Sequence, residues 1–319
     1  MNLGEPTVPI EAAGRRLEEG LMLPNFLIIG AGKCGTTSLW SLLRQHPEIG
    51  MSRVKEPDFF SHHYDRGLEW YATFFEGLED KKAVGEASHH NSKAGLHPEV
   101  VPRIMRDLGI IPLIYIVRHP LARIESAYVQ TRHQIRNRTS ADFRTAVRTM
   151  PALVESSLYW KQVQAYRRYW PDELILVLFL EDFKKDPHGT LRRCFLHLGV
   201  DPDVRIEAAT RPRNQRPGRR SQTKLLVHLR RLPFYERVRR LLPTALEGRL
   251  HYVVPDPEWD DDTRRWVVEQ VYPDTQQFLA FYGKPADFWD FEPIPSGTRL
   301  PEALAADGGP QGRPERAAP

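Results

Sequence analysis

The stretch Asn25–Leu39, "NFLIIGAGKCGTTSL", determines the fold that we expect. A short apolar run enters a glycine-rich turn, and Thr36 and Thr37 begin the segment that follows. A strand that leads into such a turn and then a helix directs backbone N–H groups and the positive end of the helix dipole at one spot, which favours an anion. We therefore predict a phosphate-binding loop that consists of Gly32, Lys33, Cys34, Gly35, Thr36 and Thr37.

The lysine of this loop stands in an unusual place. Nucleotide hydrolases carry G-x-x-x-x-G-K-[ST], with the lysine directly after the last glycine, whereas Lys33 precedes Gly35 by two residues. No acidic residue after an apolar run is an obvious magnesium ligand, and Glu181-Asp182 is the nearest candidate. We therefore expect a metal-free reaction at a 5′-phosphate with Lys33 beside it, and we assign no metal ligands.

The apolar runs of the chain indicate the architecture around this loop. Residues 26–30, 111–117 and 173–183 read as strands, and the continuous run of residues 111–117 is typical of a strand buried on both faces. They alternate with amphipathic helical patterns, which implies a parallel sheet with right-handed crossovers. We predict an α/β fold, a P-loop-type three-layer sandwich with a central parallel sheet flanked by helices.

Length and composition indicate one main domain. The 319 residues are 41% hydrophobic and 27% charged, which suits a single large α/β domain. We place it at residues 24–292, after an N-terminal arm at 1–23 and before a disordered C-terminal tail, rich in Pro, Gly and Ala, at 293–319. The net charge of +4 suits a pocket for a polyanionic small molecule and does not by itself indicate nucleic acid. Because we see no signal peptide or membrane span, and only two distant cysteines, we expect a cytoplasmic protein.

A family resemblance extends this reading. The segment "GAGKCGTTSLWSLLRQHPEI" is similar to the 5′-phosphosulfate loop of sulfotransferases that use 3′-phosphoadenosine 5′-phosphosulfate (PAPS), above all the heparan-sulfate type and its bacterial relatives. The stretches "KEPDFF", "VGEAS", "YIVRHPLARIESAY" and "LEDFKKDP" follow in the family order, so the resemblance covers about residues 24 to 200. It implies PAPS as co-substrate and a hydroxyl-bearing acceptor, which is a saccharide, a lipid or a small metabolite.

The resemblance also implies contacts to the nucleotide. Arg118 ends a buried strand, where ligands of open α/β sheets bind, and with Ser126 eight residues later it matches the family pair that grips the 3′-phosphate. Arg123 lies between them as a reserve cation. Tyr159 resembles a family tyrosine near the nucleotide, although a helical aromatic also suits the core. A basic loop stands where the family covers the 3′-phosphate, and its candidates are Arg213, Arg219 and Arg220.

Two candidates compete for the role of general base. Glu56 in "KEPDFF" matches the glutamate that deprotonates the acceptor in heparan-type enzymes, and Lys55 beside it would hold an acceptor or sulfate oxygen. The family pattern fails at Ala87, where many heparan-type members carry a lysine that assists catalysis. Cytosolic small-molecule relatives use a histidine in this region, so His89 or His90 is the rival of Glu56, which we favour.

The expected reaction is metal-independent, in-line sulfuryl transfer in which Lys33 neutralises charge on the leaving oxygen. A P-loop kinase or nucleotide hydrolase that uses ATP and magnesium is the first alternative, and a non-catalytic nucleotide-binding protein is the second. We expect acceptor-lining loops at residues 55–63, 88–96 and 132–149, whose sequences identify neither the acceptor nor an oligomeric state.

Overall fold

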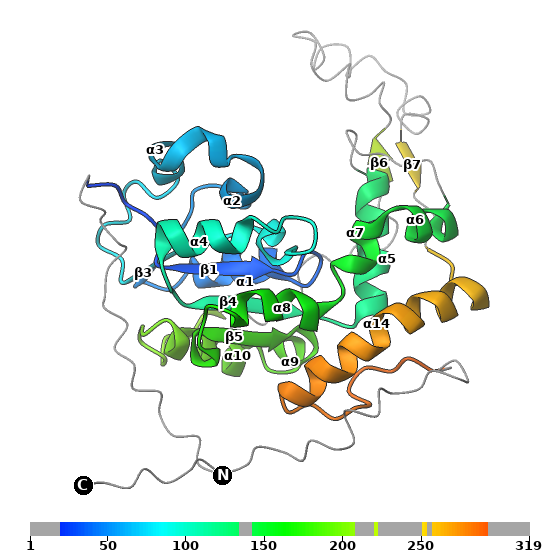
Figure 1. Cartoon of the computed structure of the whole chain (residues 1–319). Coiled ribbons are helices and arrows are strands. Elements are labelled where there is room, and N and C mark those ends of the chain that lie inside the picture. Colours follow the sequence, from blue (N-terminus) through cyan, green and yellow to red (C-terminus); the bar gives the residue numbers. More distant parts are fainter. Residues whose placement is uncertain (1–19, 134–141, 208–219, 223–250, 254–256, 293–319) are drawn as a thin grey trace, which may run out of the picture.

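The central feature of the computed structural model is a five-stranded parallel sheet (Figure 1). The structure describes residues 20–133, 142–207, 220–222, 251–253 and 257–292. The strands of the sheet are β1 (Phe26–Gly30), β2 (Ile49–Met51), β3 (Ala83–Ala87), β4 (Leu113–Val117) and β5 (Ile175–Phe179). Their order across the sheet is β2-β3-β1-β4-β5, and every neighbouring pair is parallel.

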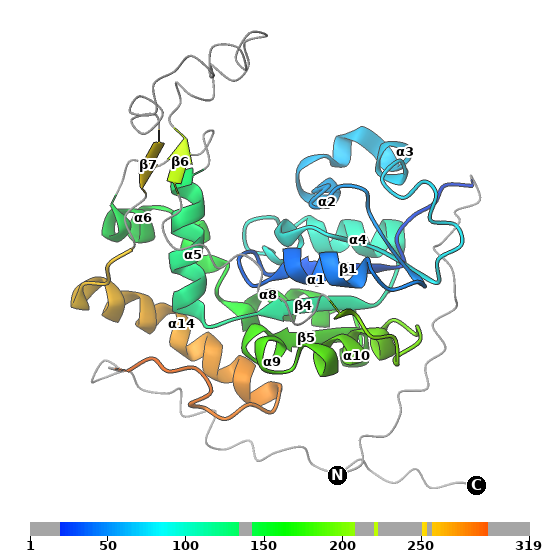
Figure 2. The ribbon, with the colours of Figure 1, turned by 180° about the vertical axis from the view of Figure 1, so that it is seen from behind.

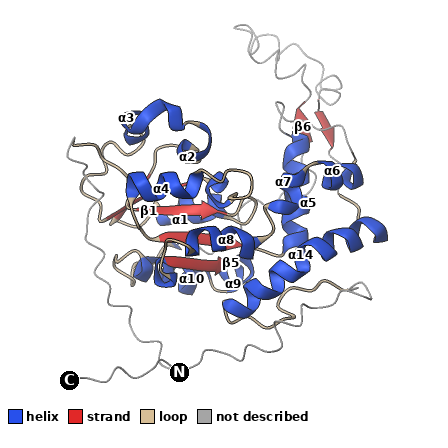
Figure 3. Ribbon diagram, viewed as in Figure 1, coloured by secondary structure: helices blue, strands red, loops and turns tan. Residues whose placement is uncertain are grey.

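Helices cover the sheet on both faces (Figure 3). The described α-helices are α1 (Thr36–Leu43), α2 (Phe59–His62), α3 (Gly67–Ala72), α4 (Val100–Leu108), α5 (Pro120–His133), α6 (Phe143–Thr149), α7 (Pro151–Glu155), α8 (Tyr159–Arg167), α9 (Leu180–Lys185), α10 (Pro187–His197) and α14 (Asp261–Phe281). Three short 3₁₀ turns are η1 (Tyr64–Arg66), η2 (His89–Ser92) and η3 (Asp172–Leu174). A separate antiparallel pair joins β6 (Arg220–Gln222) to β7 (His251–Val253).

The strands are apolar on both faces because the sheet lies between two cores. Leu27 and Ile29 of β1 belong to the core shared with α4, α8 and α14, whereas Phe26 and Ile28 belong to the core shared with α1, α9 and α10. Figure 1 shows α4 and α8 in front of the sheet, and Figure 2 shows α1, α9 and α10 on the opposite side. The predicted three-layer α/β sandwich is therefore confirmed.

Some boundaries differ from the sequence-based prediction. The strand expected at residues 173–183 ends at Phe179, because Leu180 and Phe183 stand three residues apart and pack as one face of α9. Leu23, which we assigned to the N-terminal arm, is completely buried in the core, so the packed part of the chain begins before residue 24. Residues 1–19 of the arm and the C-terminal tail lie outside the described residues.

The parallel arrangement brings several loops to one edge of the sheet. The carboxyl ends of the strands all point the same way, and Figure 1 shows α5 and α7 beyond them. The glycine-rich turn follows β1, η2 follows β3, and Arg118 follows β4. This edge is where ligands bind in open α/β sheets.

Candidate active site

The glycine-rich turn has the conformation of an anion-binding loop. Its start is fixed by the Ala31 N–H, which donates to the Ile116 carbonyl at 2.7 Å. Lys33 and Gly35 have φ values of 73° and 99°, in the left-handed region that favours glycine. Gly35 is the N-cap of α1 and has no side chain that can accept from the first N–H groups of the helix. With exposed Thr37 beside them, these donors suit an anion.

Arg123 supports the loop from below. Its side chain is only 4% exposed. Its Nε donates to the Gly32 carbonyl at 3.3 Å, and its Nη1 donates to the Leu153 carbonyl at 2.7 Å and to Ser157 Oγ at 3.2 Å. The prediction of Arg123 as a reserve cation for the 3′-phosphate is therefore wrong, because protein carbonyls and a hydroxyl enclose the guanidinium.

The side chains of Tyr159 and Cys34 also lie in the core beneath the loop. Both residues are 0% exposed, and Tyr159 Oη lies 3.7 Å from Cys34 Sγ and donates to the Arg118 carbonyl at 2.8 Å. Burial raises the pKa of the Cys34 thiol to about 11, so the thiol stays protonated at neutral pH. Protein atoms surround both side chains, so a contact of Cys34 with the nucleotide would come from its backbone, and the contacts of both residues with the nucleotide stay predictions.

Arg118 connects the end of β4 to the loop. Its side chain is half-buried, and its Nη1 donates to the Lys33 carbonyl at 3.2 Å. Ser126 is half-buried two helical turns further on, in α5. Their joint grip on a 3′-phosphate stays a prediction. Arg213 and Arg219 lie outside the described residues, and Arg220 begins β6 without a described side chain.

The two rival bases, Glu56 and His89, lie side by side. His89 Nδ1 is 3.1 Å from Glu56 Oε1, and the Lys55 ammonium forms an ion pair with the same oxygen. Burial by itself would raise the pKa of Glu56, yet His89 and the Lys55 ammonium hold it well below its usual range. Burial lowers the pKa of His89 to about 4. Both side chains are consequently in a form that accepts a proton at neutral pH.

The ring of His89 connects this pair to the phosphate loop. A Cβ atom placed on Gly32 would lie 2.6 Å from His89 Cδ2, so the ring occupies the space that only a glycine leaves open. Gly30 makes a similar approach to Ser92, because a Cβ there would lie 2.1 Å from Ser92 Oγ. The predicted phosphate loop and the two candidate bases therefore lie next to each other.

Comparison with known proteins identifies the family of this chain. The family model described as "Sulfotransferase domain" matches residues 23–214, which is more than half of the chain. The chain belongs to the sulfotransferase family. A sulfotransferase from Alicyclobacillus acidocaldarius has a similar structure, with a TM-score of 0.60 and 23% identity over 83% of this chain and 98% of that one, which supports the fold.

Curated relatives are similar to this chain over parts of their length. The membrane-associated sulfotransferase kil1 of Dictyostelium discoideum is 40% identical over 34% of this chain and 23% of its own length. The mouse heparan sulfate glucosamine 3-O-sulfotransferase 6 is 31% identical over 63% of this chain and 58% of its own. The chain thus spans less than two thirds of the length of either relative. Among the helices that the structure describes, none combines the length and apolarity that crossing a bilayer requires.

The acidic residue near the end of β3, Glu86, has a structural role. Glu86 is completely buried, and its carboxyl oxygens accept from Ser88 Oγ at 2.7 Å and from Asn91 Nδ2 at 3.1 Å. Burial raises its pKa to about 8. Ser88 Oγ also accepts from the Asp58 N–H at 3.0 Å, so this network holds the Glu56 segment against η2. Ala87 is 1% exposed in the core and offers no group to the site.

Sequence reasoning missed a lysine on this side of the site. Lys93 directly follows η2 and is half-buried. Burial and the charge of Arg123 lower its pKa to about 8, while the charges of Asp58 and Glu56 act against that shift. An ammonium near these carboxylates supplies positive charge in the region where Ala87 replaces the family lysine. The position of Lys93 in the sequence, six residues after Ala87, does not indicate that it lies near the site. Only the turn of η2 brings it back toward Asp58 and Glu56.

The contact between Gly32 and His89 leads to a stability prediction. We expect Gly32→Ala to lower the free energy of unfolding by about 1–3 kcal/mol, the usual cost of overpacking a filled site, because the new methyl group meets the imidazole. In a His89→Ala background the same substitution should cost less, since the ring is gone. Urea unfolding of the four proteins measures this coupling, and strictly additive costs would contradict the proposed contact.

Proposed function

We propose that this protein transfers the sulfuryl group of PAPS to a hydroxyl group of its acceptor. The observation that carries the proposal is the direct packing of His89, the partner of Glu56, against Gly32 of the phosphate loop. A nucleotide whose 5′-phosphosulfate occupies that loop presents its sulfur toward the carboxylate. Family membership supports PAPS as the donor.

Two side chains of this protein serve the two steps that move charge in this reaction: Glu56 accepts the proton, and Lys33 faces the leaving oxygen. The acceptor oxygen forms a bond to sulfur while its proton passes to the Glu56 carboxylate. The bond between sulfur and the bridging oxygen breaks, and adenosine 3′,5′-bisphosphate leaves with the negative charge. Lys33 stabilises that charge, so orientation and fixed electrostatics carry most of the catalysis, as in phosphoryl transfer.

The kinase or hydrolase alternative is weaker for a structural reason. The carboxylates nearest to a magnesium-binding position already have partners: Asp182 Oδ2 accepts from Lys284 Nζ at 2.6 Å, and Glu181 Oε1 accepts from the His119 N–H at 3.0 Å. The Lys284 ammonium beside Asp182 repels a magnesium ion at this position. We therefore favour sulfuryl transfer over ATP hydrolysis.

The acceptor class is part of the proposal. Relatives named as heparan sulfate glucosamine 3-O-sulfotransferases support a saccharide hydroxyl. Glu56 lies in one predicted acceptor loop, residues 55–63, beside His89 of another, residues 88–96. The cytoplasmic location stays a prediction from the sequence.

The decisive experiment combines binding and transfer. Calorimetry should detect binding of adenosine 3′,5′-bisphosphate, and labelled PAPS should yield a labelled product in a screen of saccharide, phenol and alkyl-alcohol acceptors. Binding of ATP with magnesium-dependent release of phosphate, or the absence of any affinity for the bisphosphate, would overturn the proposal. Tight bisphosphate binding with no transfer to any acceptor would favour the non-catalytic alternative.

Arg118→Ala tests the nucleotide side of the site. We expect the dissociation constant of adenosine 3′,5′-bisphosphate to rise about 10- to 100-fold, because a hydrogen bond to a charged group is worth about 1.5–3 kcal/mol. The value of kcat at saturating PAPS should change much less. Arg205→Ala, at an exposed arginine outside the site, is the control. Unchanged affinity in Arg118→Ala would remove Arg118 from the nucleotide site.

A further inference from the structure

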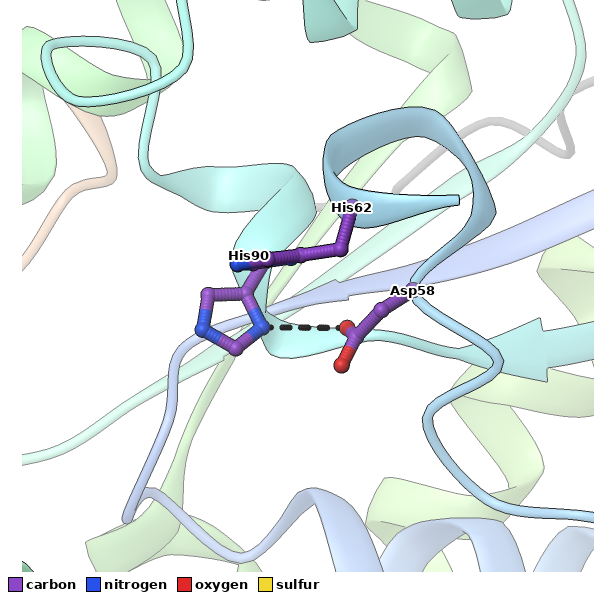
Figure 4. Close-up of side chains that lie close together, drawn as sticks. All are labelled: Asp58, His62 and His90. Carbon is purple, nitrogen blue, oxygen red and sulfur yellow. Dashed lines mark hydrogen bonds and ion pairs between the residues drawn. The ribbon is translucent and has the colours of Figure 1, made fainter. Parts of the chain in front are cut away.

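A cluster of metal-binding side chains lies next to the proposed base. Asp58, His62 and His90 each offer one ligand atom, and these atoms lie within 4.8 Å of one another (Figure 4). Asp58 Oδ1 is 3.0 Å from His90 Nδ1, and the His62 and His90 rings are 4.5 Å apart at their centroids, inclined by 70°. Sulfuryl transfer as proposed above uses none of the three.

Two separate segments build this cluster. Asp58 is the N-cap of α2 and His62 is its last residue, whereas His90 belongs to η2 after β3. The Ser61 hydroxyl lies 2.8 Å from His62 Nδ1, which leaves Nε2 as the ring nitrogen of His62 that a metal can use. His62 is exposed, whereas Asp58 and His90 are half-buried, so an ion in solution can reach the cluster.

We propose that Asp58, His62 and His90 form a binding site for Zn²⁺. Two imidazole nitrogens and one carboxylate oxygen are a donor set that Zn²⁺ prefers, and three protein ligands with one further position are usual for this ion. Ca²⁺ and Mg²⁺ prefer oxygen donors and suit the site poorly. The fourth position belongs to water or to His97, whose ring lies 5.0 Å from that of His62 and 5.8 Å from that of His90.

Such an ion has a positioning role. It joins the start of α2 to η2. Glu56 lies two residues before Asp58, the N-cap of α2, and His89 is the first residue of η2. The Asp58 N–H already donates to Ser88 Oγ at 3.0 Å, and Asp58 Oδ1 already contacts His90, so a bound ion adds His62 to an existing connection between the same two segments. The inference goes beyond the proposed function, because zinc binding is measured without PAPS or acceptor and does not depend on sulfuryl transfer.

The first test is direct metal binding by the untagged full-length protein after treatment with a chelator. Calorimetric titration with Zn²⁺ should show one equivalent bound. His62→Asn, His90→Asn and Asp58→Asn should each weaken binding at least about tenfold, since even outer-shell partners contribute about 10- to 100-fold. His63→Asn is the matched control, because His63 adjoins His62 and its ring lies 6.5 Å from that of His62, yet it packs against Trp70 at 5.4 Å and contributes no ligand atom to the cluster.

Two results would overturn the proposal. One is wild-type protein that binds no stoichiometric Zn²⁺, and the other is a His62→Asn/His90→Asn double variant that binds it as tightly as the wild type. Circular dichroism verifies the fold of each variant. X-ray absorption of zinc-loaded wild-type protein needs no variant: two or three imidazole ligands are expected, and a shell without imidazole would refute the site.

Discussion

Lys33→Ala is expected to lower kcat for sulfuryl transfer about 10²- to 10³-fold, the usual loss when one group that stabilises transition-state charge is removed. The backbone of Lys33 is fixed in the left-handed region with φ of 73°, and Arg118 donates to its carbonyl. The ammonium therefore extends from a rigid loop. Because charge on the bridging oxygen grows as the sulfur–oxygen bond breaks, loss of the ammonium should affect turnover more than binding of adenosine 3′,5′-bisphosphate.

Single-turnover transfer from labelled PAPS, with calorimetry of the bisphosphate on the same samples, separates the two effects. Lys185→Ala, at an exposed lysine at the end of α9, controls for a general loss of positive charge. Turnover of Lys33→Ala within a few fold of the wild type would remove Lys33 from the chemical step. Equal losses in the two variants would assign the effect to long-range electrostatics instead.

The sequence predicts most of the fold because the deciding signals are local. Strand, turn and helix around Lys33 are contiguous, and the apolar run of β4 is long enough to indicate a strand buried on both faces. The three-residue strand β2 is too short to give such a signal. The end of β5 was placed too late because Leu180 and Phe183 continue an apolar run although they already belong to a helix.

The site was less predictable because its contacts join distant segments. Arg123 has the sequence context of a ligand-binding cation, and only the carbonyl of Leu153, thirty residues away, shows that it is a buried support. Asp58 and His90 are 32 residues apart, so no spacing motif indicates that they meet. Glu56 is predicted from the family resemblance, whereas its contact with His89 depends on the packing of η2.

Substituting each of the two candidate bases separately should identify the one that takes the proton. We expect Glu56→Gln to lower kcat about 10²- to 10⁴-fold, the usual contribution of a general base, because glutamine keeps the shape of the side chain and loses its basicity. His89→Asn should lower kcat only about tenfold, since in our assignment His89 orients the carboxylate and packs on Gly32 but does not accept the proton.

Glu56 is favoured because its carboxylate has two neighbours that fix its orientation, the Lys55 ammonium and the His89 imidazole. The kinetics are measured at saturating PAPS and one fixed pH, with Glu69→Gln, at an exposed glutamate of α3, as the control. Binding of adenosine 3′,5′-bisphosphate should be unchanged in Glu56→Gln, which separates a chemical role from a structural one. The opposite order of losses, with His89→Asn the more damaged variant and Glu56→Gln within about tenfold of wild type, would make His89 the base.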